Sequence, residues 1–158
     1  MTRVLSWDVG YSTGGFSVVD FNGEGQLDLL YCENIITKSK GFTDKLVEYS
    51  LHFEQLLNKY SPSVFVYEEP IMKGQVGAKL NQVIGVIRCL AKKQDLIEKS
   101  YTPTEMKKIV SGKGTAEKEE IIAAVQKIFS GRVFLKEENH AADSLGLFLC
   151  YFYEVSKP

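Results

Sequence analysis

Acidic side chains stand directly after short apolar runs in this sequence. Asp8 ends the run in "VLSWD", and Glu68 and Glu69 end the run in "SVFVYEE". A carboxylate at the end of a buried strand can bind a metal ion or, with glycines beside it, help to hold a phosphate group. Glycines do follow Asp8, before a second apolar run that ends in Asp20. The residues alone therefore leave open a metal site and a phosphate-binding turn.

Two further side chains open the last helical pattern, "ENHAADSLGLF". His140 and Asp143 are spaced i, i+3 and share a helical face, and Asn139 is suited to cap this helix. If the helix lies across the sheet, both side chains join Asp8 and one glutamate. Because side chains of a strand alternate between faces, only one of the two glutamates can point the same way as Asp8.

Carboxylates gathered in this way repel one another and need a cation. Oxygen ligands suit Mg²⁺ or Mn²⁺. Two such ions, about 3.5–4 Å apart, activate water and stabilise the leaving oxygen at a phosphodiester. Each residue also has an ordinary explanation: a turn or cap for Asp8, a strand end for the glutamates, a surface helix start for His140. Spacing alone does not decide between these interpretations.

The elements that would position these side chains follow from hydrophobic periodicity. Three runs rich in β-branched and aromatic residues predict an antiparallel meander, and two short buried runs predict a fourth and a fifth strand. The predicted strands span 3–9, 15–21, 26–36, 63–70 and 96–102. Helices are predicted from Thr43, as N-cap, to Tyr60, and at about 76–93, 104–110, 116–129 and 140–154.

Three antiparallel strands followed by alternating helices and strands predict an α/β protein with a mixed five-stranded sheet and helices on both faces, the layout of the ribonuclease H-like fold. The first and fourth strands are neighbours in such a sheet, which would put Asp8 beside a glutamate. The glycines at 10, 14 and 15 are expected to make a tight return turn that lets the backbone approach a ligand.

Length and composition predict one domain, residues 1–158, of the soluble globular class. No apolar stretch is long enough to cross a membrane, and Asp8 interrupts the first apolar run too early for a signal peptide. Cys32, Cys89 and Cys150 are far apart and form no CxxC motif, which indicates a reducing cytoplasm and no zinc site.

Charge is unevenly distributed although the formal net charge is −1. Residues 1–72 carry 5 basic and 10 acidic side chains, residues 73–118 carry 10 and 4, and the remainder carries 4 and 6. The basic block is either a footprint for a polyanion or a set of solvated helical faces.

The motifs resemble those of the RuvC family of Holliday junction resolvases, in the same order along nearly the whole chain. The matching segments are "WDVGYSTGGFSVVD", "VFVYEEP", "KLNQVIGVI", "TPTEMKKIVSGKGTAEKEEI" and "HAADSLGLFLCY". The resemblance implies a metal-dependent endonuclease that nicks four-way or other branched DNA symmetrically as a homodimer, leaving 5′ phosphate and 3′ hydroxyl ends. It also implies two Mg²⁺ ions per site, for which Mn²⁺ substitutes.

The same resemblance assigns roles to individual residues. It makes Asp8, Glu68, His140 and Asp143 the catalytic metal ligands, with Glu68 selected over Glu69 as the first acid after the apolar run. Lys118 joins them as a catalytic residue. The residues expected to contact DNA are Lys73, Lys107, Lys113, Lys118, Ile71 and Met72.

Three features depart from the family pattern. His140 stands where some relatives carry an acid, which leaves three roles open to it: a ligand favouring Mn²⁺, a water-holding group or a proton relay. Ile71 and Met72 replace an aromatic residue that stacks on a base, which leaves apolar wedging. The chain ends soon after the last helix, so contact with a branch-migration motor is not assumed.

The helix at 76–93 is a candidate dimer interface or an ordinary core helix.

Two alternatives remain at this stage. An actin-like or sugar-kinase-like ATP-binding domain also begins with D-x-G and a hairpin, but such proteins need two of these domains, and this chain has room for one. A junction-binding protein without catalysis would lack one of the acidic positions, and all of them are present.

Overall fold

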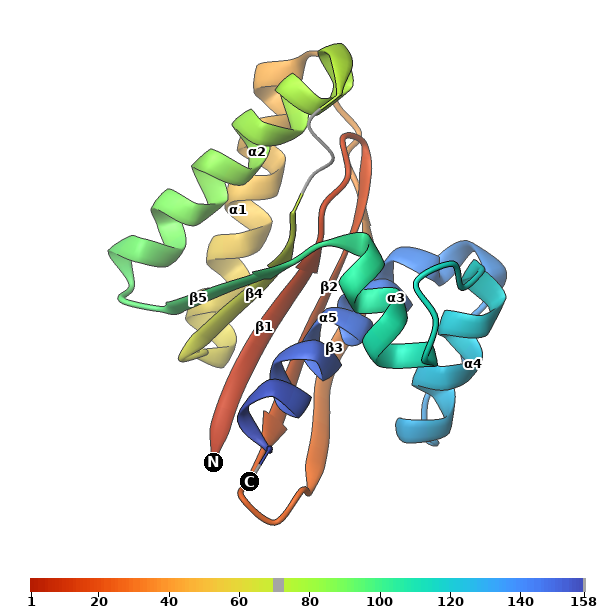
Figure 1. Ribbon diagram of the computed structural model, residues 1–158. Helices are drawn as coiled ribbons and strands as arrows, with labels where there is room; N and C mark the ends of the chain where they lie inside the picture. Colours follow the sequence, from red (N-terminus) through yellow and green to blue (C-terminus); the bar gives the residue numbers. More distant parts are fainter. Residues whose placement is uncertain (70–72, 158) are drawn as a thin grey trace.

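The computed structural model describes residues 1–69 and 73–157, which form one twisted sheet between two layers of helices (Figure 1). Strand order in the sheet is β3-β2-β1-β4-β5. β1 pairs antiparallel with β2 and parallel with β4, and β5 is parallel to β4. The predicted mixed five-stranded sheet is therefore confirmed. The strands are β1 Thr2–Asp8, β2 Thr13–Phe21, β3 Leu27–Ile36, β4 Val64–Glu68 and β5 Ile97–Tyr101.

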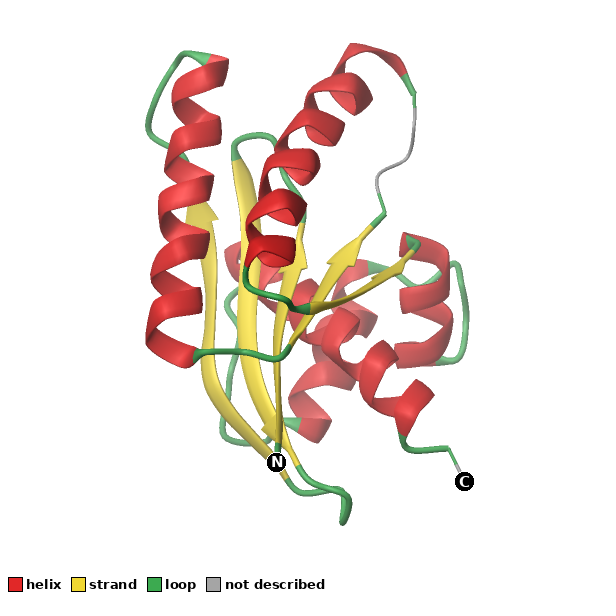
Figure 2. Cartoon of the chain, turned by 90° about the vertical axis from the view of Figure 1, so that its left-hand side faces the viewer, coloured by secondary structure: helices red, strands yellow, loops and turns green. Residues whose placement is uncertain are grey.

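The helices cover both faces of the sheet. Helices α1 and α2 lie on one face, and α3, α4 and α5 lie on the other (Figures 1 and 2). The helices are α1 Phe42–Tyr60, α2 Gly74–Lys93, α3 Pro103–Ser111, α4 Lys118–Ile128 and α5 Asn139–Val155, with a 3₁₀ turn η1 at Lys136–Glu138 that the sequence patterns did not predict. Within the described ranges, no helix combines the length and apolarity that crossing a bilayer requires.

Side-chain alternation along the central strands divides the interior into two cores. Leu5 and Trp7 of β1 pack with the apolar faces of α1 and α2, whereas Val4 packs with α5. The same alternation sends Asp8 toward the α5 side, opposite to Trp7. Helix α5 is buried over most of its length, which explains why its apolar residues surround almost its whole circumference.

Two local expectations, both about helix caps, were wrong. Gly41, not Thr43, is the N-cap of α1, and no side chain caps this end. The helix starts early because Phe42 stacks on Tyr11, with ring centroids 5.7 Å apart, which holds the first turn in place. Glu138, not Asn139, precedes α5 as its N-cap, because η1 leads directly into the helix.

Candidate active site

The sheet register brings Asp8 and Glu68 together. Trp7 of β1 pairs with Tyr67 of β4 in the parallel ladder, so Asp8 and Glu68 are the next residues on neighbouring strands. Both follow residues that pack under α1 and α2, and alternation therefore directs both carboxylates to the α5 side. Asp8 is buried and Glu68 is half-buried.

Glu69 takes a different direction. Its carboxylate accepts a hydrogen bond of 2.6 Å from the Ser100 hydroxyl of β5, and the residue is exposed. Its backbone N–H extends the pairing of β4 with β5 by donating to the Tyr101 carbonyl. Glu69 thus stands at the edge of the sheet, and Glu68 is the glutamate beside Asp8.

A glycine in β2 makes room for the start of α5. Gly15 pairs with Asp8 across the β1–β2 ladder, and a Cβ built at Gly15 would lie 2.0 Å from the carbonyl oxygen of His140. Any side chain there would push α5 away from the sheet. The absence of one lets His140 Nδ1 approach Asp8 Oδ2 to 2.6 Å, a contact that requires one proton between the two atoms.

The other two glycines serve the turn itself. A Cβ at Gly10 would lie 1.4 Å from the Thr13 carbonyl oxygen, so the predicted tight return turn is confirmed. Gly14 packs close to the Asp8 carbonyl and the Tyr49 hydroxyl. The expectation that these glycines leave the backbone open to a ligand does not hold for Gly15, which packs against α5.

Asn34 of β3 anchors the same helix end, and sequence reasoning missed it. Its side-chain oxygen accepts a 2.7 Å hydrogen bond from the Ala141 N–H, and its side-chain nitrogen donates to the Glu137 carbonyl at 2.5 Å. Asn34 pairs with Gly15 in the sheet, directly beneath α5. The signal available in the sequence was the polar amide of Asn34 within a strand-forming run, opposite Gly15 of the preceding strand.

Burial raises the pKa of all three carboxyl groups, and neighbouring carboxylates raise those of Asp8 and Glu68 further. Burial, and then the charge of Asp143, raise the pKa of Asp8 well above its ordinary value. Burial together with Asp8 and Asp143 raises the pKa of Glu68 to about 8. Burial raises the pKa of Asp143 to about 6. Close acidic groups in a dry environment cannot all be ionised without a compensating positive charge.

Basic residues approach this cluster without pairing directly with it. Lys118, the first residue of α4, lowers the pKa values of Asp8 and Asp143, and Lys107 of α3 lowers those of Glu68 and Asp143. Burial lowers the pKa of His140, which favours the neutral imidazole. Two lysines therefore give this carboxylate-rich end of the sheet a partial positive border.

Lys107 and Lys118 thus lie within electrostatic reach of the acidic cluster, whereas other residues expected at the DNA are placed differently. Lys113 forms an ion pair of 2.5 Å with Glu120 on α4. Lys73 is exposed at the N-cap of α2. Ile71 and Met72 lie outside the described residues.

The side chains of Asp8, Glu68, His140 and Asp143 are of the types that bind divalent cations. Three carboxylates and one imidazole offer oxygen and nitrogen ligands. Burial, and for Asp8 and Glu68 also the charge of neighbouring carboxylates, raises the pKa values of the three carboxyl groups, and a cation relieves this cost of ionisation. In the described part of the chain, no three histidine, cysteine or carboxylate side chains already converge on one ion position. His140 instead bonds to Asp8, and this bond must open if both atoms are to bind metal.

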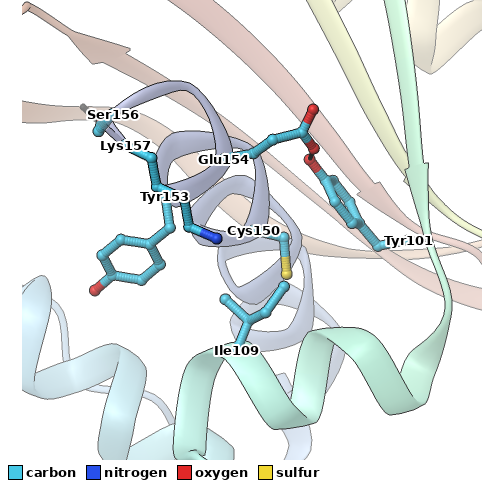
Figure 3. Close-up of a pocket in the computed structure, with 7 residues that line it drawn as sticks. All are labelled: Tyr101, Ile109, Cys150, Tyr153, Glu154, Ser156 and Lys157. Carbon is cyan, nitrogen blue, oxygen red and sulfur yellow. Dashed lines mark hydrogen bonds between the residues drawn. The ribbon is translucent and has the colours of Figure 1, made fainter.

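One hollow on the described surface lies away from the acidic cluster. It has a volume of about 610 Å³ between β5, α3 and the end of α5, and Figure 3 shows its lining residues. Glu154 beside it accepts hydrogen bonds from Tyr101 and Lys99, which tie the end of α5 to β5. None of the acidic cluster lines this hollow, so it is separate from the candidate site.

Comparisons with known proteins agree along the whole chain. Residues 4–151 match the family model described as "Crossover junction endodeoxyribonuclease RuvC". The RuvC of Wolbachia sp. subsp. Brugia malayi is 26% identical over 99% of this chain and 97% of its own. The RuvC of Shewanella woodyi is 29% identical over 97% of this chain and 88% of its own.

Solved structures share the fold. A structure of Thermus thermophilus RuvC aligns with a TM-score of 0.82 at 21% identity, covering 98% of this chain and 95% of that one. A second structure of the same protein, in complex with a Holliday junction substrate, also aligns with a TM-score of 0.82, at 23% identity over 99% and 96% of the two chains. The ribonuclease H-like fold expected from the sequence is therefore confirmed.

Proposed function

The chain belongs to the RuvC family of crossover junction endodeoxyribonucleases, and from this premise we propose that it resolves four-way DNA junctions by hydrolysing phosphodiester bonds at the end of β1. The observation that carries the proposal is the cluster of Asp8, which is buried, with Glu68 and Asp143, which are half-buried, without a paired lysine or arginine in the described part of the chain. The comparisons favour neither an ATP-binding domain nor a junction-binding protein without catalysis.

The four residues Asp8, Glu68, His140 and Asp143 are the proposed ligands of two Mg²⁺ ions, for which Mn²⁺ substitutes. When bound, such ions supply charge neutralisation and activate water for attack on a phosphodiester. The protein holds its ligands on rigid elements: two strand ends and the first two turns of a buried helix. The fold limits the access of solvent to the cluster, so electrostatic interactions there are stronger than they would be in water.

Lys118 and Lys107 act on the DNA rather than on the ligands in this proposal. Lys118 starts α4 at the rim of the cluster, where an ammonium stabilises the negative charge that develops on the phosphate. Lys107, on α3, contacts the backbone phosphates beside it and adds affinity. Lys73, Lys113, Ile71 and Met72 complete the proposed DNA surface, with Ile71 and Met72 as apolar wedges.

Symmetric nicking of a four-way junction requires two sites related by a two-fold axis, so the proposed active species is a homodimer of one nuclease domain, residues 1–158. The products carry 5′ phosphate and 3′ hydroxyl ends. A cytoplasmic location fits a DNA substrate and three free cysteines. No contact with a branch-migration motor is part of this proposal.

Labelled four-way, three-way and linear duplex DNA, incubated with the purified protein and Mg²⁺, test the proposal. We expect paired nicks at symmetric positions of the four-way junction, none in the linear duplex, and no cleavage with chelator. Ligation of the products by a DNA ligase checks the end groups. Equal cleavage of linear duplex, or cleavage in chelator, would contradict the proposal.

A further inference from the structure

A lysine held by two aromatic rings lies at the site end of the sheet, on the α1–α2 side. Tyr11, in the β1–β2 turn, stacks on Phe42 of α1 with an interplanar angle of 17°. The Lys79 ammonium of α2 stands 5.2 Å from the Tyr11 ring centroid and 5.8 Å from that of Phe42. Figure 2 shows the turn and the starts of both helices at this end. We call Tyr11, Phe42 and Lys79 the lysine–aromatic cluster.

A second lysine fixes the turn that carries Tyr11. Lys45 is only 7% exposed, and its ammonium donates hydrogen bonds to the hydroxyls of Ser12, at 2.9 Å, and Thr37, at 3.0 Å. It also lies 5.3 Å from the Tyr11 ring centroid. A buried ammonium is costly unless its donors are satisfied. These contacts of Lys45 therefore hold the β1–β2 turn against α1. Tyr11, which this turn carries, lies three residues after Asp8 in the sequence.

Positive charge collects around the cluster. Lys38 and Lys40, in the loop before α1, and Lys73, at the start of α2, are exposed. Two acids of α1 stand near this end: Asp44, in the first turn, is exposed, and Glu48 accepts hydrogen bonds from the backbone N–H groups of residues 38 and 39. Lys79 is exposed, and it has no carboxylate within ion-pair distance among residues 1–69 and 73–157. At this end of the described structure, four exposed lysines, none of them in an ion pair, outnumber the two acids at the start of α1.

We propose that the lysine–aromatic cluster is a second DNA contact, in which Lys79 binds a backbone phosphate of the strand that passes over the end of β1 from the acidic cluster. This inference rests on the proposed nuclease function. Tyr11 and Phe42 are positioning residues: their ring faces attract the ammonium and limit its rotamers, so less freedom is lost when the phosphate binds. The partner is identified by its chemistry, a polyanion that extends from the active site.

Junction binding in the Asp8→Asn background, without cleavage, tests the phosphate contact. Lys79→Ala should weaken binding to a four-way junction about threefold to tenfold near 0.15 M salt and reduce the slope of log K against log salt by about one. Lys59→Ala is the matched control, because Lys59 also stands over a ring, 4.9 Å from the Tyr60 centroid, but at the other end of α1. It should change neither affinity nor slope.

A double-mutant cycle tests the role of the rings. Tyr11→Leu should lose affinity comparable to Lys79→Ala, Tyr11→Phe should retain it, and Tyr11→Leu should add no loss once Lys79 is alanine. A further loss in that background would mean that DNA contacts the ring itself and would overturn the positioning role. Melting temperatures of all variants identify any loss that comes from unfolding.

The two proposals fail in different ways. If the parent protein does not cleave junctions, the nuclease function fails. If the parent cleaves and the Asp8→Asn protein binds the junction, but Lys79→Ala keeps the parental affinity and salt slope, only the second DNA contact is overturned.

Discussion

Asp8 and Asp20 are equally buried but have opposite surroundings. Each is 5% exposed, and each follows an apolar run in the first two strands. Asp20 receives two hydrogen bonds of 2.7 Å from the Arg3 guanidinium on β1, which form a bidentate ion pair. Asp8, at the other end of β1, bonds to His140, and its remaining charged neighbours include Asp143 and Glu68.

The difference separates a structural carboxylate, Asp20, from a proposed functional one, Asp8. A buried charge with a bidentate partner is compensated within the fold, whereas a buried charge among like charges costs stability until something external neutralises it. Uncompensated clusters of this kind are typical of active sites. The ends of a single strand, β1, thus carry a stabilising ion pair and a catalytic candidate.

The largest expected effect breaks this comparison directly. Asp8→Asn should reduce the single-turnover cleavage rate about 1,000-fold or more while retaining or improving junction affinity, because it removes a proposed ligand and a charge that repels phosphate. Asp20→Asn should lower the free energy of unfolding by about 1–3 kcal/mol, since it leaves Arg3 unpaired, without changing the rate per folded molecule. Equal rate losses in both variants would contradict the comparison.

The adjacent residues Glu68 and Glu69 allow the same comparison, between a proposed metal ligand and a carboxylate with a structural partner, at neighbouring positions. Glu68→Gln should reduce the cleavage rate about 100-fold or more, because Glu68 faces Asp8. Glu69→Gln should change it less than about threefold, since that side chain bonds to Ser100 at the sheet edge. Rates at saturating junction compare the two. Similar losses of rate in the two variants would contradict the assignment of Glu68, rather than Glu69, as the carboxylate that acts with Asp8.

Variants of His140 test what the hydrogen-bond partner of Asp8 contributes to cleavage. His140→Ala should reduce cleavage about 10–100-fold, because it removes the side chain that orients Asp8 and a proposed ligand. His140→Asp should retain activity with Mg²⁺ and reduce any advantage of Mn²⁺, because the shell becomes all oxygen. Cleavage in both metals gives the readout. Parental activity of His140→Ala would leave three carboxylates as the site.

The two ends of α4 isolate the effect of positive charge on the reaction. Lys118→Ala should reduce the rate at saturating junction about tenfold, since its ammonium lies within electrostatic reach of Asp8 and Asp143. Lys127→Ala, in the last turn of the same helix, serves as control and should retain the parental rate. If both variants behave alike, proximity to the carboxylates is not what matters.

The smallest expected effect is on stability. The pKa of Glu68 is about 8 in the folded protein and 4.5 without the fold. The folded state therefore holds this proton more tightly, and the stability of metal-free protein should fall as pH rises from about 5 to 8. Glu68→Gln should raise the melting temperature at pH 8 by about 3–8 °C, but much less at pH 5. Mg²⁺ should stabilise the parent at pH 8. A parallel pH dependence of parent and variant would contradict this.

The strands and the long helices were predictable because they depend on local patterns. Alternation and periodicity within a few residues located β1, β2, β4 and α5, and the order of elements predicted β1 beside β4. The same alternation established that one glutamate would face Asp8. The start of α1 was predicted wrongly because Phe42 stacks on Tyr11, a contact between residues far apart in sequence.

By itself, the sequence determined which side chains were available for chemistry and the strand or helix on which each stands. Only the tertiary structure decided that Asp20 is compensated by Arg3 and Asp8 is not, that Gly15 admits the start of α5, and that Lys79 meets Tyr11. The physical reason is one of range. Secondary structure follows from interactions between near neighbours, whereas compensation of a buried charge depends on strand register and helix packing between residues that the sequence separates widely.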